Sequence, residues 1–132
     1  MTKLLFITGA SSGLGQALAW RFYQAGYALA LVARRTADIE AWASSRGLAC
    51  DRYRVYRADV AVTDSIVSAA QACLTTQGVP DVVLACAGIS IGVDTRERAD
   101  LDVMSATFAT NNVGTAATFH AFVEPMCRRG AG

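Results

Sequence analysis

The fold of this chain is decided by one turn, which reads Thr8-Gly9-Ala10-Ser11-Ser12-Gly13-Leu14-Gly15. The turn follows residues 3–8, a short and almost unbroken apolar run that is typical of a strand covered on both faces. After it, residues 14–25 carry apolar side chains at helical spacing, and Gly26 is expected to end that helix. The turn therefore joins a buried strand to a helix.

Each glycine of this turn meets a different steric need. Gly9 lets the chain reverse at the end of the strand, Gly13 lets the backbone approach a pyrophosphate, and Gly15 lets the helix pack closely on the strand. The helix start offers free N–H groups and partial positive charge, and residues 13–25 include no Asp or Glu to oppose an anion. The turn predicts a dinucleotide phosphate site formed by Gly9, Ser11, Ser12, Gly13, Leu14 and Gly15. A generic strand-to-helix reversal is the alternative.

The alternation of strand and helix continues along the chain. Further strands are expected at residues 27–33, 52–58 and 81–86, and further helices at residues 36–45, 64–76 and 99–128, with a loop at residues 89–98. Right-handed crossovers between such units place parallel strands in one sheet with helices on both faces. We therefore expect one domain over residues 1–132, an α/β Rossmann-type doubly wound sheet of three layers with four strands and four helices.

The composition restricts the function further. Hydrophobic residues make up 53% of the chain and charged residues 17%, which excludes a disordered protein. The formal net charge of +1 gives no strong field toward nucleic acid or anionic lipid. Residues 52–57 interleave arginine with tyrosine, as some nucleic-acid binders do, but strand alternation explains this pattern. We therefore expect no nucleic-acid partner.

The cysteines and the N-terminal sequence bear on the cellular setting. Cys50, Cys73, Cys86 and Cys127 are widely spaced, without a C-x-x-C pair, and are expected to be packing thiols rather than metal ligands. The chain also has no secretory leader pattern and no apolar run of about twenty residues that would span a membrane. A reduced, cytoplasmic protein without a bound metal is the expectation.

The glycine pattern Thr8-Gly9-x-x-x-Gly13-x-Gly15 resembles that of the short-chain dehydrogenase/reductase family. Further stretches match the family in order: Arg34, Asp59-Val60, Ala85-Cys86-Ala87-Gly88 and Asn111-Asn112-Val113-Gly114. The resemblance implies an oxidoreductase that transfers a hydride between a nicotinamide cofactor and a small carbonyl or alcohol substrate. It also implies that Asp59 and Val60 lie beside the adenine ring and that Cys86, Ala87 and Gly88 line the cofactor pocket.

The end of the second expected strand bears on the choice of cofactor. An acidic side chain there accepts hydrogen bonds from the ribose 2′-hydroxyl of NAD, but this chain has Ala33-Arg34-Arg35. Because a guanidinium pairs with phosphate, Arg34 and Arg35 predict NADP(H) over NAD(H). The alternative is that both arginines are merely solvated. Many NADP-using relatives carry a second basic residue in the glycine turn, where this chain has Ser12.

Two stretches need a separate interpretation. Ala85-Cys86 replaces the paired asparagines of the family, so Cys86 either forms a small apolar wall or marks a loss of order. In the last expected helix one apolar stripe contains Met104, Phe108, Asn111, Thr115, Phe119, Phe122 or Val123, and Met126. This stripe would bury the amide of Asn111. The resemblance implies that Asn111 kinks the helix and holds a water of a proton relay, as a candidate catalytic residue, whereas a satisfied core asparagine is the alternative.

The family's remaining chemistry is not found in this sequence. The family uses a serine and a tyrosine followed four residues later by lysine, but Lys3 is the only lysine here and no tyrosine precedes it. We therefore expect the chain to be incomplete at the C-terminus, inactive alone, and prone to form a homo-oligomer through its uncovered edge strand and last helix. A non-catalytic nucleotide-binding sensor or interaction module is the alternative function.

Overall fold

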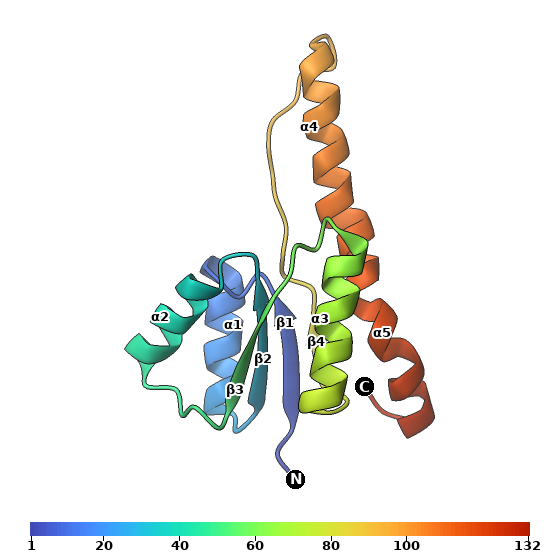
Figure 1. The fold of residues 1–132 in the computed structure, drawn as a ribbon. Coiled ribbons are helices and arrows are strands. Elements are labelled where there is room, and N and C mark those ends of the chain that lie inside the picture. The colour runs from blue at the N-terminus through green and yellow to red at the C-terminus, as the bar shows by residue number, and fades with distance from the viewer.

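Four parallel strands form the central sheet of the computed structural model, which describes residues 1–132 (Figure 1). The strands are β1 (Leu4–Thr8), β2 (Ala28–Ala33), β3 (Tyr53–Arg57) and β4 (Val82–Leu84), in the order β3-β2-β1-β4. β1 is buried along its whole length because it is paired on both sides, with β2 and with β4. The expected Rossmann-type sheet of four parallel strands is confirmed.

Helices cover both faces of this sheet. The helices α1 (Gly13–Gln24) and α2 (Thr36–Arg46) lie on one face, and α3 (Thr63–Thr76) and α5 (Gly114–Arg129) lie on the other (Figure 1). Because successive side chains of a strand point to opposite faces, Leu5 and Ile7 pack toward α1 and α2, whereas Phe6 packs against Phe122 of α5. The two hydrophobic cores so formed confirm the three layers.

The fourth strand is shorter than the expected residues 81–86. The Asp81 side chain accepts a hydrogen bond from the N–H of Leu4 at 2.7 Å, which holds the chain at the start of β4. At the other end, the N–H of Ala87 donates to the side-chain oxygen of Thr8 at 3.1 Å. Backbone pairing with β1 therefore extends only over Val82–Leu84, and the chain then leaves the sheet.

The helix expected over residues 99–128 is divided into three parts. It comprises α4 (Arg98–Phe108), a π-helical turn η1 (Ala109–Val113) and α5. α4 projects beyond the carboxyl ends of the strands and contains no buried residue (Figure 1). A π-helical turn takes up about one extra residue, which rotates the following helix by about 100° relative to a continuous α-helix. A single stripe predicted at α-helical spacing therefore cannot keep its direction.

The predicted apolar stripe is mostly on the wrong face. Phe108, Phe119 and Val123 are exposed, and Asn111 is exposed as well, so the expectation that Asn111 is buried was wrong. The buried face of α5 instead consists mainly of small residues: Gly114, Ala117, Thr118, Ala121 and Phe122. A Cβ on Gly114 would lie 2.7 Å from the carbonyl oxygen of Val60. The helix therefore approaches its neighbours through small side chains, which a search for large apolar residues does not detect.

None of the helices combines the length and the apolar character needed to cross a membrane. No group of three or more His, Cys, Asp or Glu side chains lies together in a way that could hold a metal ion. The four cysteines are free thiols; Cys73 is buried and Cys86 is half-buried, whereas Cys50 and Cys127 are exposed.

Candidate functional site

One cavity lies where the carboxyl ends of the strands meet, and its volume is about 490 Å³. This is within the range of roughly 300–1,000 Å³ that small-molecule sites occupy. Every residue predicted to contact a cofactor lies in its wall: Gly9, Ser11, Ser12, Gly13, Leu14, Gly15, Arg34, Arg35, Asp59, Val60, Cys86, Ala87 and Gly88. Segments that are far apart in the sequence thus form one site.

The wall also includes residues that the sequence did not single out. They are Val32, Ala33, Ala58, Ala61, Ile89, Ala106 and Thr110. Most are direct neighbours of predicted residues at the ends of strands, so extending each predicted stretch by one or two positions would have found them. Ala106 and Thr110 come from α4 and η1, which contribute to the wall from outside the sheet.

The glycine turn between β1 and α1 is shaped by close backbone contacts. Gly9 and Gly13 have positive φ angles of 68° and 52°. A Cβ on Gly9 would lie 2.8 Å from the backbone nitrogen of Ala87, and one on Gly15 would collide with the carbonyl oxygen of Gly9. A Cβ on Gly13 would meet no protein atom within 4 Å. Gly9 and Gly15 therefore serve packing, whereas Gly13 lies in the cavity wall and has open space beside it.

The first turn of α1 is electrostatically suited to an anion. It contains no acidic residue, and its N-cap residue Ser12 makes no side-chain capping hydrogen bond, so that the first N–H groups of the helix have no such partner. The side chain of Gln16 donates to the carbonyl oxygen of Ser11 at 2.8 Å, which fixes the preceding peptide. The start of α1 and the two serines of the turn thus lie in the cavity wall without an acidic neighbour in the first helical turn.

The two arginines after β2 differ in their surroundings. The Nε of Arg35 lies 3.1 Å from Oδ2 of Asp38, and both side chains are largely exposed. Arg34 is exposed and takes part in none of the salt bridges of the chain. Because no carboxylate neutralises it, the guanidinium of Arg34 is the more available of the two for an anionic ligand.

The segment after β3 is held by its own side chains. Oδ1 of Asp59 accepts a hydrogen bond from the N–H of Ala61 at 3.0 Å, and the N–H of Asp59 donates to the hydroxyl of Ser65 at 3.0 Å. Val60 is buried and packs in the core between the sheet and α5. The positions of Asp59 and Val60 in the cavity wall are therefore fixed by the protein itself.

The amide of Asn111 holds the segment that follows β4. Its Oδ1 accepts from the N–H of Ile89 at 2.8 Å, and its Nδ2 donates to the carbonyl oxygen of Ile89 at 2.7 Å. A Cβ on Gly88 would lie 3.2 Å from the same Oδ1. Asn111 is not in the cavity wall. It does bond both backbone groups of Ile89, and Ile89 lies in that wall. Both polar atoms of the amide thus have a backbone partner although the residue is exposed.

Cys86 lies in the wall between β4 and this clamped segment. Burial raises the pKa of its thiol, so the side chain stays neutral near pH 7. These properties agree with a small apolar wall, which is one of the two alternatives that the sequence left open.

None of the side chains in the cavity wall is a tyrosine, lysine or histidine. The Tyr53 hydroxyl donates to Glu40 at 3.1 Å, and the Tyr56 hydroxyl donates to Gln77 at 2.8 Å, both away from the cavity. His120 is exposed on α5. The polar groups in the wall are therefore suited to binding an anionic ligand, and none is an obvious proton donor for a carbonyl group.

Fold and cavity together place the chain among the Rossmann-type α/β proteins. A family model described as short chain dehydrogenase matches residues 3–132, and the chain belongs to this family. Its members are oxidoreductases that use NAD(P) and act on carbonyl or alcohol groups of small molecules.

Individual relatives show how much of a member this chain represents. A dehydrogenase/reductase SDR family protein 7-like of Drosophila melanogaster is 35% identical, over 98% of this chain and 41% of the relative. Sulfoacetaldehyde reductase of Chromohalobacter salexigens is 31% identical, over 100% of this chain and 52% of the relative. A short-chain dehydrogenase structure from Streptomyces avermitilis superposes with a TM-score of 0.87 at 28% identity, over 100% of this chain and 47% of that one. The chain spans about half the length of the curated relatives that it matches.

Proposed function

We propose that the cavity binds NADP(H), and that the protein to which this chain belongs transfers a hydride between NADP(H) and a small carbonyl or alcohol substrate. The observation that carries the cofactor preference is Arg34, an exposed guanidinium without a salt bridge at the end of β2. A carboxylate at this position would favour the ribose hydroxyls of NAD, whereas a guanidinium favours the 2′-phosphate of NADP.

In this proposal, different residues of the wall bind different parts of the cofactor. Gly13 and the N–H groups at the start of α1 would hold the pyrophosphate, with the hydroxyls of Ser11 and Ser12 as further donors. Asp59 and Val60 would bound the adenine, and Cys86, Ala87 and Gly88 would line the other half of the cofactor. The nicotinamide ring supplies the hydride when it is bound. Asn111 acts as a positioning residue, because it reaches the cavity only through Ile89.

The proton donor for this reaction is proposed to lie outside residues 1–132. The cavity wall includes no tyrosine, lysine or histidine, so the chain alone is expected to bind the cofactor without turning over a substrate. The same observation favours a second candidate function, a nucleotide-binding sensor or interaction module without catalysis. Oxidation of NADPH by the purified 132 residues in the presence of aldehydes or ketones would contradict the expected inactivity.

A second copy of the chain is the proposed partner of the exposed apolar face of α4 and α5. Phe108, the last residue of α4, is 56% exposed, and Val123, in α5, is 55% exposed. Large apolar side chains that are exposed to this extent are candidates for a contact with another chain. The edge of β4 is free as well, because β4 pairs only with β1.

The cofactor preference can be tested by titration calorimetry of NADPH and NADH against the unmodified protein and an Arg34→Glu variant. We expect NADPH to bind at least tenfold more tightly, since charge-assisted contacts contribute roughly 1.5–3 kcal/mol. The Arg34→Glu variant is expected to lose this preference. An Arg35→Glu variant is the matched control, and it should lose less because Asp38 already engages Arg35. Equal affinities for the two cofactors would contradict the proposal.

A further inference from the structure

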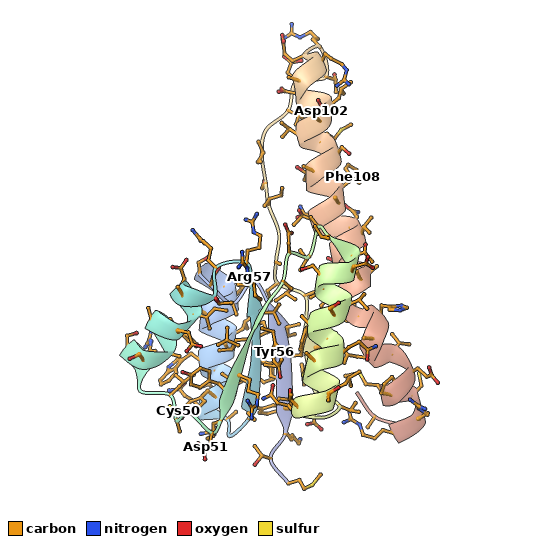
Figure 2. The ribbon with its side chains drawn as sticks, in the orientation of Figure 1. Cys50, Asp51, Tyr56, Arg57, Asp102 and Phe108 are labelled. Atoms are coloured by element: carbon orange, nitrogen blue, oxygen red, sulfur yellow. The ribbon has the colours of Figure 1, made fainter.

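Arg57 is the last residue of β3. In the sheet it lies next to the end of β2, which Arg34 follows at the proposed site of the 2′-phosphate. Its Cα pairs with that of Ala33, the last residue of β2, and Arg34 follows directly. Paired residues of adjacent strands are about 5 Å apart, so Arg57 and Arg34 leave the sheet side by side at its carboxyl edge. Figure 2 shows Arg57 at this end of β3, with Cys50 and Asp51 beyond the opposite end.

The direction of the Arg57 side chain follows from the strand register. Tyr53 and Val55 pack against the core that α1 and α2 cover, and Arg57 shares their face because side chains alternate along a strand. Ala33, its partner in β2, faces the same core. The side chain of Arg57 therefore leaves β3 on the face of the sheet that α1 and α2 cover, and its pairing partner Ala33 is followed directly by Arg34.

Neither Arg57 nor Arg34 has an anionic partner. Both are exposed, and neither takes part in a salt bridge or a side-chain hydrogen bond. The two residues that follow Arg57, Ala58 and Asp59, line the cavity. Guanidinium groups that leave adjacent strands repel each other unless an anion lies between them, and a phosphate group accepts hydrogen bonds from several arginines at once.

We propose that Arg57 is a second specificity-determining residue, which contacts the 2′-phosphate of NADP(H) together with Arg34; this inference rests on the proposed function. Arg57 would also replace the second basic residue that many NADP-using relatives carry in the glycine turn, where this chain has Ser12. The dianion would be held from β2 and β3 rather than from β2 and the glycine turn.

The test compares two ligands that differ only in the 2′-phosphate, namely 2′,5′-ADP and 5′-AMP. Their affinities are measured by titration calorimetry for the unmodified protein, for Arg57→Gln and for Arg54→Gln. Arg54 is the matched control, because it is also an exposed arginine of β3, but it pairs with Ala30 in mid-strand and its side chain alternates to the opposite face. We expect Arg57→Gln to weaken 2′,5′-ADP roughly fivefold to tenfold and to leave 5′-AMP unchanged. Arg54→Gln should change neither affinity.

The outcomes separate this inference from the proposed function. If the unmodified protein binds 2′,5′-ADP no more tightly than 5′-AMP, the NADP preference is wrong and the inference with it. If the preference is present but Arg57→Gln behaves as Arg54→Gln does, only the inference is overturned. An equal loss of both ligands in Arg57→Gln would also overturn it, because that result indicates a structural role for Arg57.

Discussion

The side-chain amide of Asn111 bonds both the N–H and the carbonyl of Ile89, as the backbone of a neighbouring strand would do in a sheet. An Asn111→Ala substitution removes both bonds and releases Ile89, which lies in the cavity wall, whereas Ala87 is still held by Thr8. We expect the affinity for NADPH to fall roughly fivefold to tenfold, since each hydrogen bond contributes about 1 kcal/mol. The neighbouring exposed residue Asn112 provides the control, and an equal effect of Asn112→Ala in titration calorimetry would contradict this role.

Two glycines of the turn are expected to respond differently to the same substitution. Gly15→Ala places a Cβ against the carbonyl oxygen of Gly9 and should lower the free energy of unfolding by roughly 3 kcal/mol or more. Gly13→Ala meets no protein atom, so only its left-handed backbone conformation is unfavourable, by about 1 kcal/mol. Gly13→Ala should therefore fold and yet bind NADPH poorly. Denaturant unfolding and calorimetry measure the two effects; normal NADPH affinity in folded Gly13→Ala would show that no phosphate lies there.

Cys86 is expected to react slowly with alkylating reagents. Burial raises the pKa of its thiol above the ordinary value of 9.0, so the reactive thiolate is scarce near pH 7 and becomes more abundant as the pH rises. Peptide mass spectrometry after iodoacetamide treatment should show the exposed Cys50 and Cys127 modified first, with the rate at Cys86 still rising above pH 9. NADPH should protect Cys86 alone; equal protection of Cys50 would indicate a general effect on the fold.

At the scale of elements, the strands and α1 could be predicted because their patterns are local. A buried strand such as β1 is a short apolar run, and α1 follows it at helical spacing. The family resemblance implies a kink at Asn111, which lies within η1, but the local pattern could not reveal the π-helical form of this turn, since an i→i+5 hydrogen-bond pattern leaves no mark on composition. The buried face of α5 was missed for a different reason. Its close contact with Val60 requires the small residue Gly114, whereas hydrophobic periodicity selects large side chains.

The large apolar residues that α4 and α5 expose lead to a prediction about self-association. Replacing Phe119 and Val123 by serine should reduce the mass of the particle in solution, measured by light scattering after size exclusion, because both side chains are exposed in the single chain. The double variant should keep its unfolding temperature at low protein concentration. Arg128→Gln, on the same helix, is the control. A monomeric unmodified protein would contradict the proposed second copy.

At the scale of the whole molecule, the components of the site were predictable but some of its contacts were not. Parallel strands bring their carboxyl ends to one edge, so separate stretches such as the glycine turn and Asp59-Val60 could be assigned to one cavity. Ala106 and Thr110 could not be assigned to this cavity from the sequence, because their positions in its wall depend on the course of α4 and η1. The position of Arg57 beside Arg34 depends on the β2–β3 register, which no local pattern reveals.

The cofactor is expected to stabilise the entire chain. A ligand that binds only the folded state contributes about 2.7 kcal/mol at a concentration of about 100 Kd. NADPH should therefore raise the unfolding temperature more than NADH does at the same concentration, as followed by circular dichroism. Equal shifts with both cofactors would contradict the NADP preference, and no shift with either would contradict cofactor binding.

The residues of the cavity wall are spread along the chain from Gly9 to Thr110. Partial unfolding is therefore expected to abolish the whole binding site. The measured dissociation constant then equals the intrinsic one divided by the folded fraction. Ile66→Ala is an example, because Ile66 is fully buried in α3 and lies outside the cavity wall. A population that is half unfolded by such a change would report about a twofold weaker affinity with an intact site. An apparent binding defect in a variant such as Ile66→Ala is therefore expected to measure the loss of folded protein and not a change in the site.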